Sequence, residues 1–78
     1  MTTMTKRDIH VIAHEIASDW KNPNYAAVPY LDAMFSLSSI NDSLGYDTAR
    51  GIVAYFLCNA GSWRGDTAKR IKKELKSL

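Results

Sequence analysis

Two histidines spaced four residues apart come closer to a chemical motif than any other side chains in this sequence. His10 and His14 would share one side of a helix, and Glu15 follows His14, as in half of a zinc-binding helix. A catalytic zinc site normally needs a third protein ligand, and Ser18 occupies the position that would complete His-Glu-x-x-His. On a helical wheel both histidines border the apolar face. We therefore expect no metal site and no cofactor, while a pH-sensitive contact of these histidines stays open.

The sequence also lacks the arrangement that nucleophilic catalysis requires. Serines, histidines and carboxylates are present, but there is no Gly-x-Ser-x-Gly turn and no glycine-rich phosphate loop. Cys58, the single cysteine, lies within an apolar run, where we expect a buried, inert thiol in a reducing compartment. The N-terminus has no apolar core of a secretion signal, and no run is long enough to span a membrane. These features predict a cytoplasmic protein that is not an enzyme.

Charge is distributed unevenly along the chain. Residues 1–63 carry four basic and six acidic side chains, a net −2, whereas residues 64–78 carry six basic and two acidic ones, a net +4. A basic terminal segment indicates an anionic partner or an acidic protein surface, although such runs also occur as plain solvated faces. Amphipathic aromatic residues beside it would serve as anchors in a protein contact. The candidate partner-binding residues are therefore Tyr55, Trp63, Arg64, Lys69, Arg70, Lys72, Lys73 and Lys76.

Two functions are open for these residues. The first is a small non-enzymatic module that contacts another protein through the basic segment and residues 63–64. The second is a nucleic-acid accessory protein that places the same cations against phosphates, with an affinity that depends on salt and not on base sequence. A helix-turn-helix is not expected, because a turn at Gly61 would put Thr67 and Arg70 at positions that this motif usually keeps apolar.

The elements that must position these residues are helices. Apolar residues recur with helical spacing over 9–20, and this helix is expected to begin at Thr5, with Asp8 in a capping-box arrangement. It should stop before Pro23, because the residue before a proline avoids the helical conformation. A shorter helix is expected to begin near Val28, with a proline in its first turn, where the missing N–H is not needed.

Residues 51–63 carry no formal charge and predict a buried central helix. We expect this helix to run over 48–60, with Asp47 as its N-terminal cap and Gly61 as its C-terminal cap. Bulky apolar residues line one face. The opposite face carries the small residues Gly51, Ala54 and Cys58. Such a helix can be packed on both sides, by its own chain or by a second copy, so a homodimer is possible.

The final helix could start at Ser62 or at Asp66 and carries a narrow apolar stripe among its basic residues. No alternating strand pattern competes, although residues 51–57 alone are also compatible with a strand. The sequence therefore predicts one all-α domain over 1–78, a compact bundle of three to four short helices around the helix 48–60. Residues 1–4 are expected to be flexible.

Four short segments carry a resemblance to known proteins. They are Ala-Met-Phe-Ser-Leu at 33–37, Ile-Asn-Asp at 40–42, Ile-Val-Ala-Tyr-Phe-Leu at 52–57 and Ser-Trp-Arg-Gly at 62–65. Together they resemble small uncharacterised proteins of enterobacterial plasmids and prophages, over nearly the whole chain. The resemblance carries no functional residue across. It implies an accessory protein of a mobile element, of a kind that commonly binds proteins or DNA.

Overall fold

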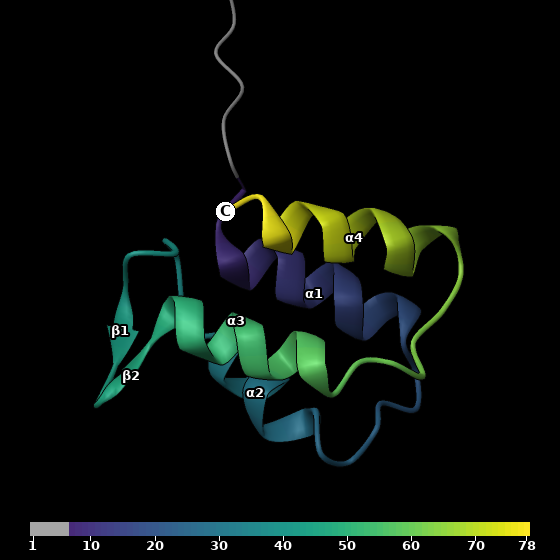
Figure 1. Ribbon diagram of the computed structural model, residues 1–78, viewed down its shortest axis with the longest axis horizontal. Coiled ribbons are helices and arrows are strands. Elements are labelled where there is room, and N and C mark those ends of the chain that lie inside the picture. Colours follow the sequence, from purple (N-terminus) through teal and green to yellow (C-terminus); the bar gives the residue numbers. More distant parts are fainter. Residues whose placement is uncertain (1–6) are drawn as a thin grey trace, which may run out of the picture.

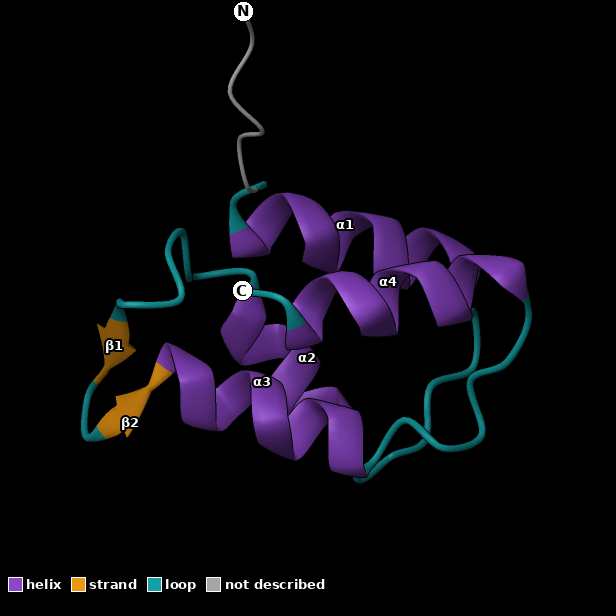
Figure 2. Ribbon diagram, turned by 45° about the horizontal axis from the view of Figure 1, so that its top comes forward, coloured by secondary structure: helices purple, strands orange, loops and turns teal. Residues whose placement is uncertain are grey.

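The computed structural model describes residues 7–78 and shows four helices with one small hairpin (Figure 1). In chain order the elements are α1 (Ile9–Asp19), α2 (Val28–Met34), β1 (Ser43–Leu44), β2 (Asp47–Thr48), α3 (Ala49–Cys58) and α4 (Asp66–Lys76). Helices α1 and α4 lie side by side and run in opposite directions, while α2 and α3 form a second pair (Figures 1 and 2). Contacts between α1 and α2 join the two pairs.

Within the described chain the fold is mostly helical, as predicted. The expectation of an all-α domain is wrong in one respect, because the chain also contains a small β-hairpin. Residues 43–48 form a two-stranded antiparallel hairpin that projects from one end of the molecule, with Leu44 paired to Asp47 (Figure 2). Gly45 is the first residue of its two-residue turn and has φ +64°, a conformation that favours glycine. Two-residue strands are too short to produce an alternating pattern, which is why the apolar spacing did not predict them.

Helix α1 follows its predicted apolar spacing closely. Ile9, Ile12, Ala13 and Ile16 are buried, as is Trp20 just beyond the helix end, whereas Ala17 is exposed against expectation. The predicted start at Thr5 and the flexible residues 1–4 lie outside the described residues.

The N-terminus of α1 is closed by a distant part of the chain. The amides of Ile9 and His10 donate to the carbonyls of Ser38 and Leu37, each at 2.9 Å. Asp8 occupies the cap position, but its side chain makes no capping hydrogen bond. The loop that follows α2 therefore satisfies amides that a capping box was expected to satisfy.

Helix α3 is shorter than the predicted helix 48–60 and is not the centre of the bundle. It ends at Cys58 with Asn59 as its C-terminal cap, so the prediction that Gly61 caps it is wrong. Its N-terminal cap is Thr48, whose Oγ1 accepts a hydrogen bond from the amide of Gly51 at 3.0 Å, because Asp47 belongs to β2. The helix packs mainly on α2 and β2. Its small-residue side is not covered by the described chain, since Ala54 and Cys58 are both exposed. The expectation that α3 is hidden on more than one side is therefore wrong.

Helix α4 begins at the second of the two predicted starts, Asp66. Gly65 precedes it with φ +112° and ψ 177°, a backbone conformation that side chains other than hydrogen strongly disfavour. The apolar stripe of α4 is buried, as predicted, through Ala68, Ile71 and Leu75. Among residues 7–78 there is no helix with the length and apolar character needed to cross a membrane.

Candidate functional site

The histidines of α1 lie at the border of the core, as predicted. His14 is exposed and places its ring edge-on against Phe35, with the ring centroids 4.8 Å apart. His10 is half-buried, and its Nε2 lies 3.3 Å from the carboxylate of Asp8. Within the part of the chain that the structure describes, no group of three or more His, Cys, Asp or Glu side chains is arranged to hold a metal ion.

Cys58 is exposed, which contradicts the prediction of a buried thiol. The reason is the register of α3: Ile52, Val53 and Phe56 face the core, and Cys58 falls on the opposite side. Its thiol is therefore accessible to solvent.

Trp63 was expected to anchor a partner at the surface, but it belongs to the core. Only 3% of it is exposed, and its indole stacks on Trp20 with ring centroids 5.7 Å apart and an interplanar angle of 11°. Phe56 meets it edge-on at 6.4 Å. The indole Nε1 donates a hydrogen bond of 2.8 Å to Asp19, which satisfies its one polar atom. Trp63 therefore holds the loop before α4 against the end of α1. It offers almost no exposed surface to a partner.

Ion pairs join α4 to the N-terminal part of the chain. Arg70 donates to the carboxylate of Glu15, and Arg7 makes two hydrogen bonds to Glu74, of 2.8 and 2.6 Å. Arg7 also lies 2.8 Å from Glu15. The two guanidinium groups, Arg70 first, hold the pKa of Glu15 below its ordinary value. Arg70 is therefore paired within the fold while its side chain stays exposed, and its contact with a partner stays a prediction.

The remaining cations of α4 share one side of the helix. Lys69, Lys72, Lys73 and Lys76 are spaced i, i+3, i+4 and i+7, which places them on one face. We call this face, together with Arg64, the basic face. Lys69, Lys73, Lys76 and Arg64 are exposed, and none of them forms an ion pair among residues 7–78.

Lys72 ties the basic face to the core beneath it. Its Nζ donates a 2.7 Å hydrogen bond to the carbonyl of Trp63 and lies 5.9 Å from the centroid of that indole ring. Partial burial lowers the pKa of Lys72, and repulsion from Arg64 and Lys76 lowers it further. Lys72 is therefore close enough to Arg64 and to Lys76 to be repelled by each of them. A hollow of about 470 Å³ borders the basic face at the N-terminal end of α4. It is lined by Gly61, Trp63, Arg64, Gly65, Asp66, Ala68, Lys69 and Lys72.

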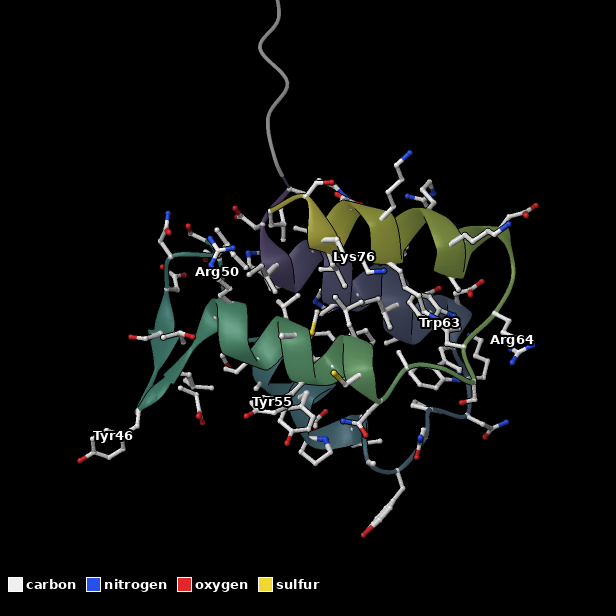
Figure 3. The ribbon with its side chains drawn as sticks, in the orientation of Figure 1. Tyr46, Arg50, Tyr55, Trp63, Arg64 and Lys76 are labelled. Atoms are coloured by element: carbon white, nitrogen blue, oxygen red, sulfur yellow. The ribbon has the colours of Figure 1, made fainter. Side chains whose placement is uncertain are left out.

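Tyr55 lies on a different surface. It projects from the side of α3 that faces away from Lys76 and Arg64 (Figure 3). Its ring stacks on Tyr30 of α2, with centroids 5.4 Å apart and an interplanar angle of 22°. Both rings line a groove of about 390 Å³ between α2, α3 and the hairpin, which we call the tyrosine groove. Its lining residues are Pro29, Tyr30, Ala33, Leu44, Asp47, Ile52 and Tyr55.

The tyrosine groove is lined mainly by aromatic and aliphatic residues, and it exposes polar and apolar surface in similar amounts. Tyr55 is 58% exposed and Leu44 is 42% exposed, and Tyr46 at the hairpin tip is fully exposed nearby (Figure 3). Asp47 supplies the one charged side chain in its lining. Sequence reasoning missed Leu44 and Asp47 because the hairpin that positions them was not expected. The Leu-Gly-Tyr-Asp run at 44–47, with glycine at the turn position, was the signal that could have found it.

The structure therefore separates the predicted contact residues into three groups. Tyr55 belongs to the tyrosine groove, Trp63 to the core, and the cations, except for the paired Arg70, to the basic face.

No known protein family, curated protein or solved structure matches the chain.

Proposed function

We propose that this protein is a non-enzymatic binding module of the cytoplasm that docks a segment of another protein in the tyrosine groove. The observation that carries the proposal is the stacked pair of half-buried Tyr30 and exposed Tyr55 beside Leu44 and Pro29. Tyrosine is enriched among the residues that dominate protein-binding energy, since its ring offers a large contact area with few rotatable bonds. A context in a plasmid or prophage, as the resemblance implies, is part of the proposal.

The lining of the groove indicates what such a segment contains. Apart from Asp47, its lining residues are aromatic or aliphatic, so the segment should place one or two apolar side chains against the exposed Tyr55 and Leu44. Asp47 is exposed at the groove and favours a lysine or arginine beside them. We therefore expect a short apolar motif flanked by a basic residue.

Peptide display against the purified protein tests the proposal. Selection should enrich apolar motifs with a neighbouring Lys or Arg, and Tyr55→Ala should weaken the selected peptides at least about tenfold, as for a residue central to binding. Tyr25→Ala is the matched control, because Tyr25 is 79% exposed and does not line the groove. Tyr55→Ala should stay folded, because loss of the stacking contact costs only about 0.5–1.5 kcal/mol beyond the surface that the partly exposed Tyr55 buries.

Three results would overturn the proposal. Selection could enrich no motif, the enriched peptides could bind Tyr55→Ala as well as wild type, or Tyr25→Ala could weaken them equally. Self-association that Tyr55→Ala abolishes would also contradict it, because a second copy would then occupy the groove.

A further inference from the structure

We propose that the basic face of α4 is a second binding surface, independent of the tyrosine groove, which holds the phosphate backbone of double-stranded DNA without reading its bases. The proposal rests on three observations. Among residues 7–78 the fold leaves several cations of this face without an ion pair, these cations are spaced along one side of α4, and the face carries no exposed aromatic ring.

The fold divides the cations of residues 64–78 into two sets. Arg70 faces α1, where it pairs with Glu15, and Glu74 on the same side of α4 accepts hydrogen bonds from Arg7. Lys69, Lys73 and Lys76 point elsewhere and are exposed. Glu15 and Glu74 are thus both paired on the side of α4 that faces α1. The positive charge of α4 is therefore concentrated on the opposite side. Asp66, in the first turn of α4, is the carboxylate that lines the hollow and reduces the charge at that end.

The spacing of these cations suits a polyanion better than a single ion. With a rise of about 1.5 Å per residue, Lys69 and Lys76 lie about 10.5 Å apart along the helix axis. Arg64 extends the row beyond the N-terminal end of α4, beside Lys72. The repulsion of Lys72 by Arg64 and by Lys76 is relieved when phosphates approach, because each phosphate supplies a counter-charge. Release of the DNA counterions then adds a favourable, salt-dependent contribution.

The composition of the face favours a duplex over a single strand. Proteins that bind single strands without sequence preference combine basic grooves with exposed aromatic rings on which bases stack. Here the nearest aromatic residue, Trp63, is buried under Lys72, and the exposed Tyr55 lies on the far side of α3. Lysine can contact guanine as well as phosphate, but the basic face carries no asparagine or glutamine, the residues that read adenine by paired hydrogen bonds. Helix α4 lies at the edge of the bundle, where it can approach a duplex (Figure 1).

Fluorescence anisotropy with a labelled, mixed-sequence duplex tests the proposal, with the single strand of the same sequence as the comparison. Four phosphate contacts predict that log K falls with log salt at a slope of about −3.6, so affinity should drop on the order of 100-fold between about 50 and 200 mM salt. Replacing Arg64, Lys69, Lys73 and Lys76 together by glutamine should remove at least about nine-tenths of the affinity and most of this slope.

Two variants make the result interpretable. Lys69→Arg with Lys73→Arg and Lys76→Arg keeps the charge and should bind as wild type does. Arg70→Gln removes one charge from the side of α4 that faces α1, and it should change the slope by clearly less than the one unit expected for Lys73→Gln. Far-UV circular dichroism confirms that each variant is folded, which is expected because the replaced lysines are exposed.

Any of four outcomes would overturn the proposal. They are no binding to the duplex at low salt, tighter binding to the single strand, unchanged binding by the glutamine variant, and equal competition by poly-glutamate of matched charge. The last outcome would point to an acidic protein surface as the partner. Failure here leaves the tyrosine groove untouched, because Tyr55→Ala alters none of these cations.

Discussion

Replacing Trp63 by alanine should remove a large part of the stability of this domain. The sequence placed Trp63 at a contact surface, where its removal would have little effect on folding. In the structure it is 3% exposed, stacks on Trp20, contacts Phe56 and donates to Asp19. The effect of this substitution on unfolding therefore separates the two interpretations directly.

The magnitude follows from these contacts. Core Trp→Ala substitutions cost about 3–5 kcal/mol through lost burial and the cavity that remains. At about 0.05–0.15 kcal/mol per residue, a chain of 78 residues has about 4–12 kcal/mol to lose. Trp63→Phe keeps an aromatic ring but removes the N–H that reaches Asp19, so we expect about 1–3 kcal/mol for that change.

Urea denaturation followed by far-UV circular dichroism measures these values, and Trp20 provides a second signal by fluorescence. Asp19→Asn is the matched control, since it weakens the same hydrogen bond from the other side, and a double-mutant cycle with Trp63→Phe should show coupling of at least about 0.5 kcal/mol. A loss below about 1 kcal/mol for Trp63→Ala, within the range typical of surface positions, would refute the burial of this residue.

Three further outcomes follow from the geometry. Gly65→Ala should destabilise by about 1–3 kcal/mol in thermal melts because of its φ of +112°, whereas Gly61→Ala, where φ is not positive and a Cβ meets open space, should be neutral or slightly stabilising. The Cys58 thiol should react with a disulfide reagent in the native state as fast as it does in urea, and strong protection would contradict its exposure. The folded-state pKa of Glu15 is lowered, so its contribution is complete above its unfolded pKa of about 4.3 and is lost as the pH falls through the folded value. Glu15→Gln should therefore flatten the fall in stability below about pH 5, and an unchanged acid profile would count against the pair with Arg70.

The sequence by itself determined the helices and much of their content. Period-3.6 spacing of apolar residues identified α1 and the buried stripe of α4, because one face of a helix must leave water whatever it packs against. The proline at the start of α2 marked that boundary through local backbone preference alone, whereas the start of α4 was left open between Ser62 and Asp66. The excess of cations after residue 63 was equally plain.

Tertiary structure alone decided which of those residues remain available to a partner. Trp63 is buried because Asp19, 44 residues earlier, and Trp20 come to meet it. Arg70 is neutralised because Glu15, 55 residues away, lies on the helix alongside. Local sequence carries no record of such long-range pairs, since they depend on how the helices pack. The tyrosine groove exists for the same reason, as its two rings belong to separate helices that only the folded chain brings together.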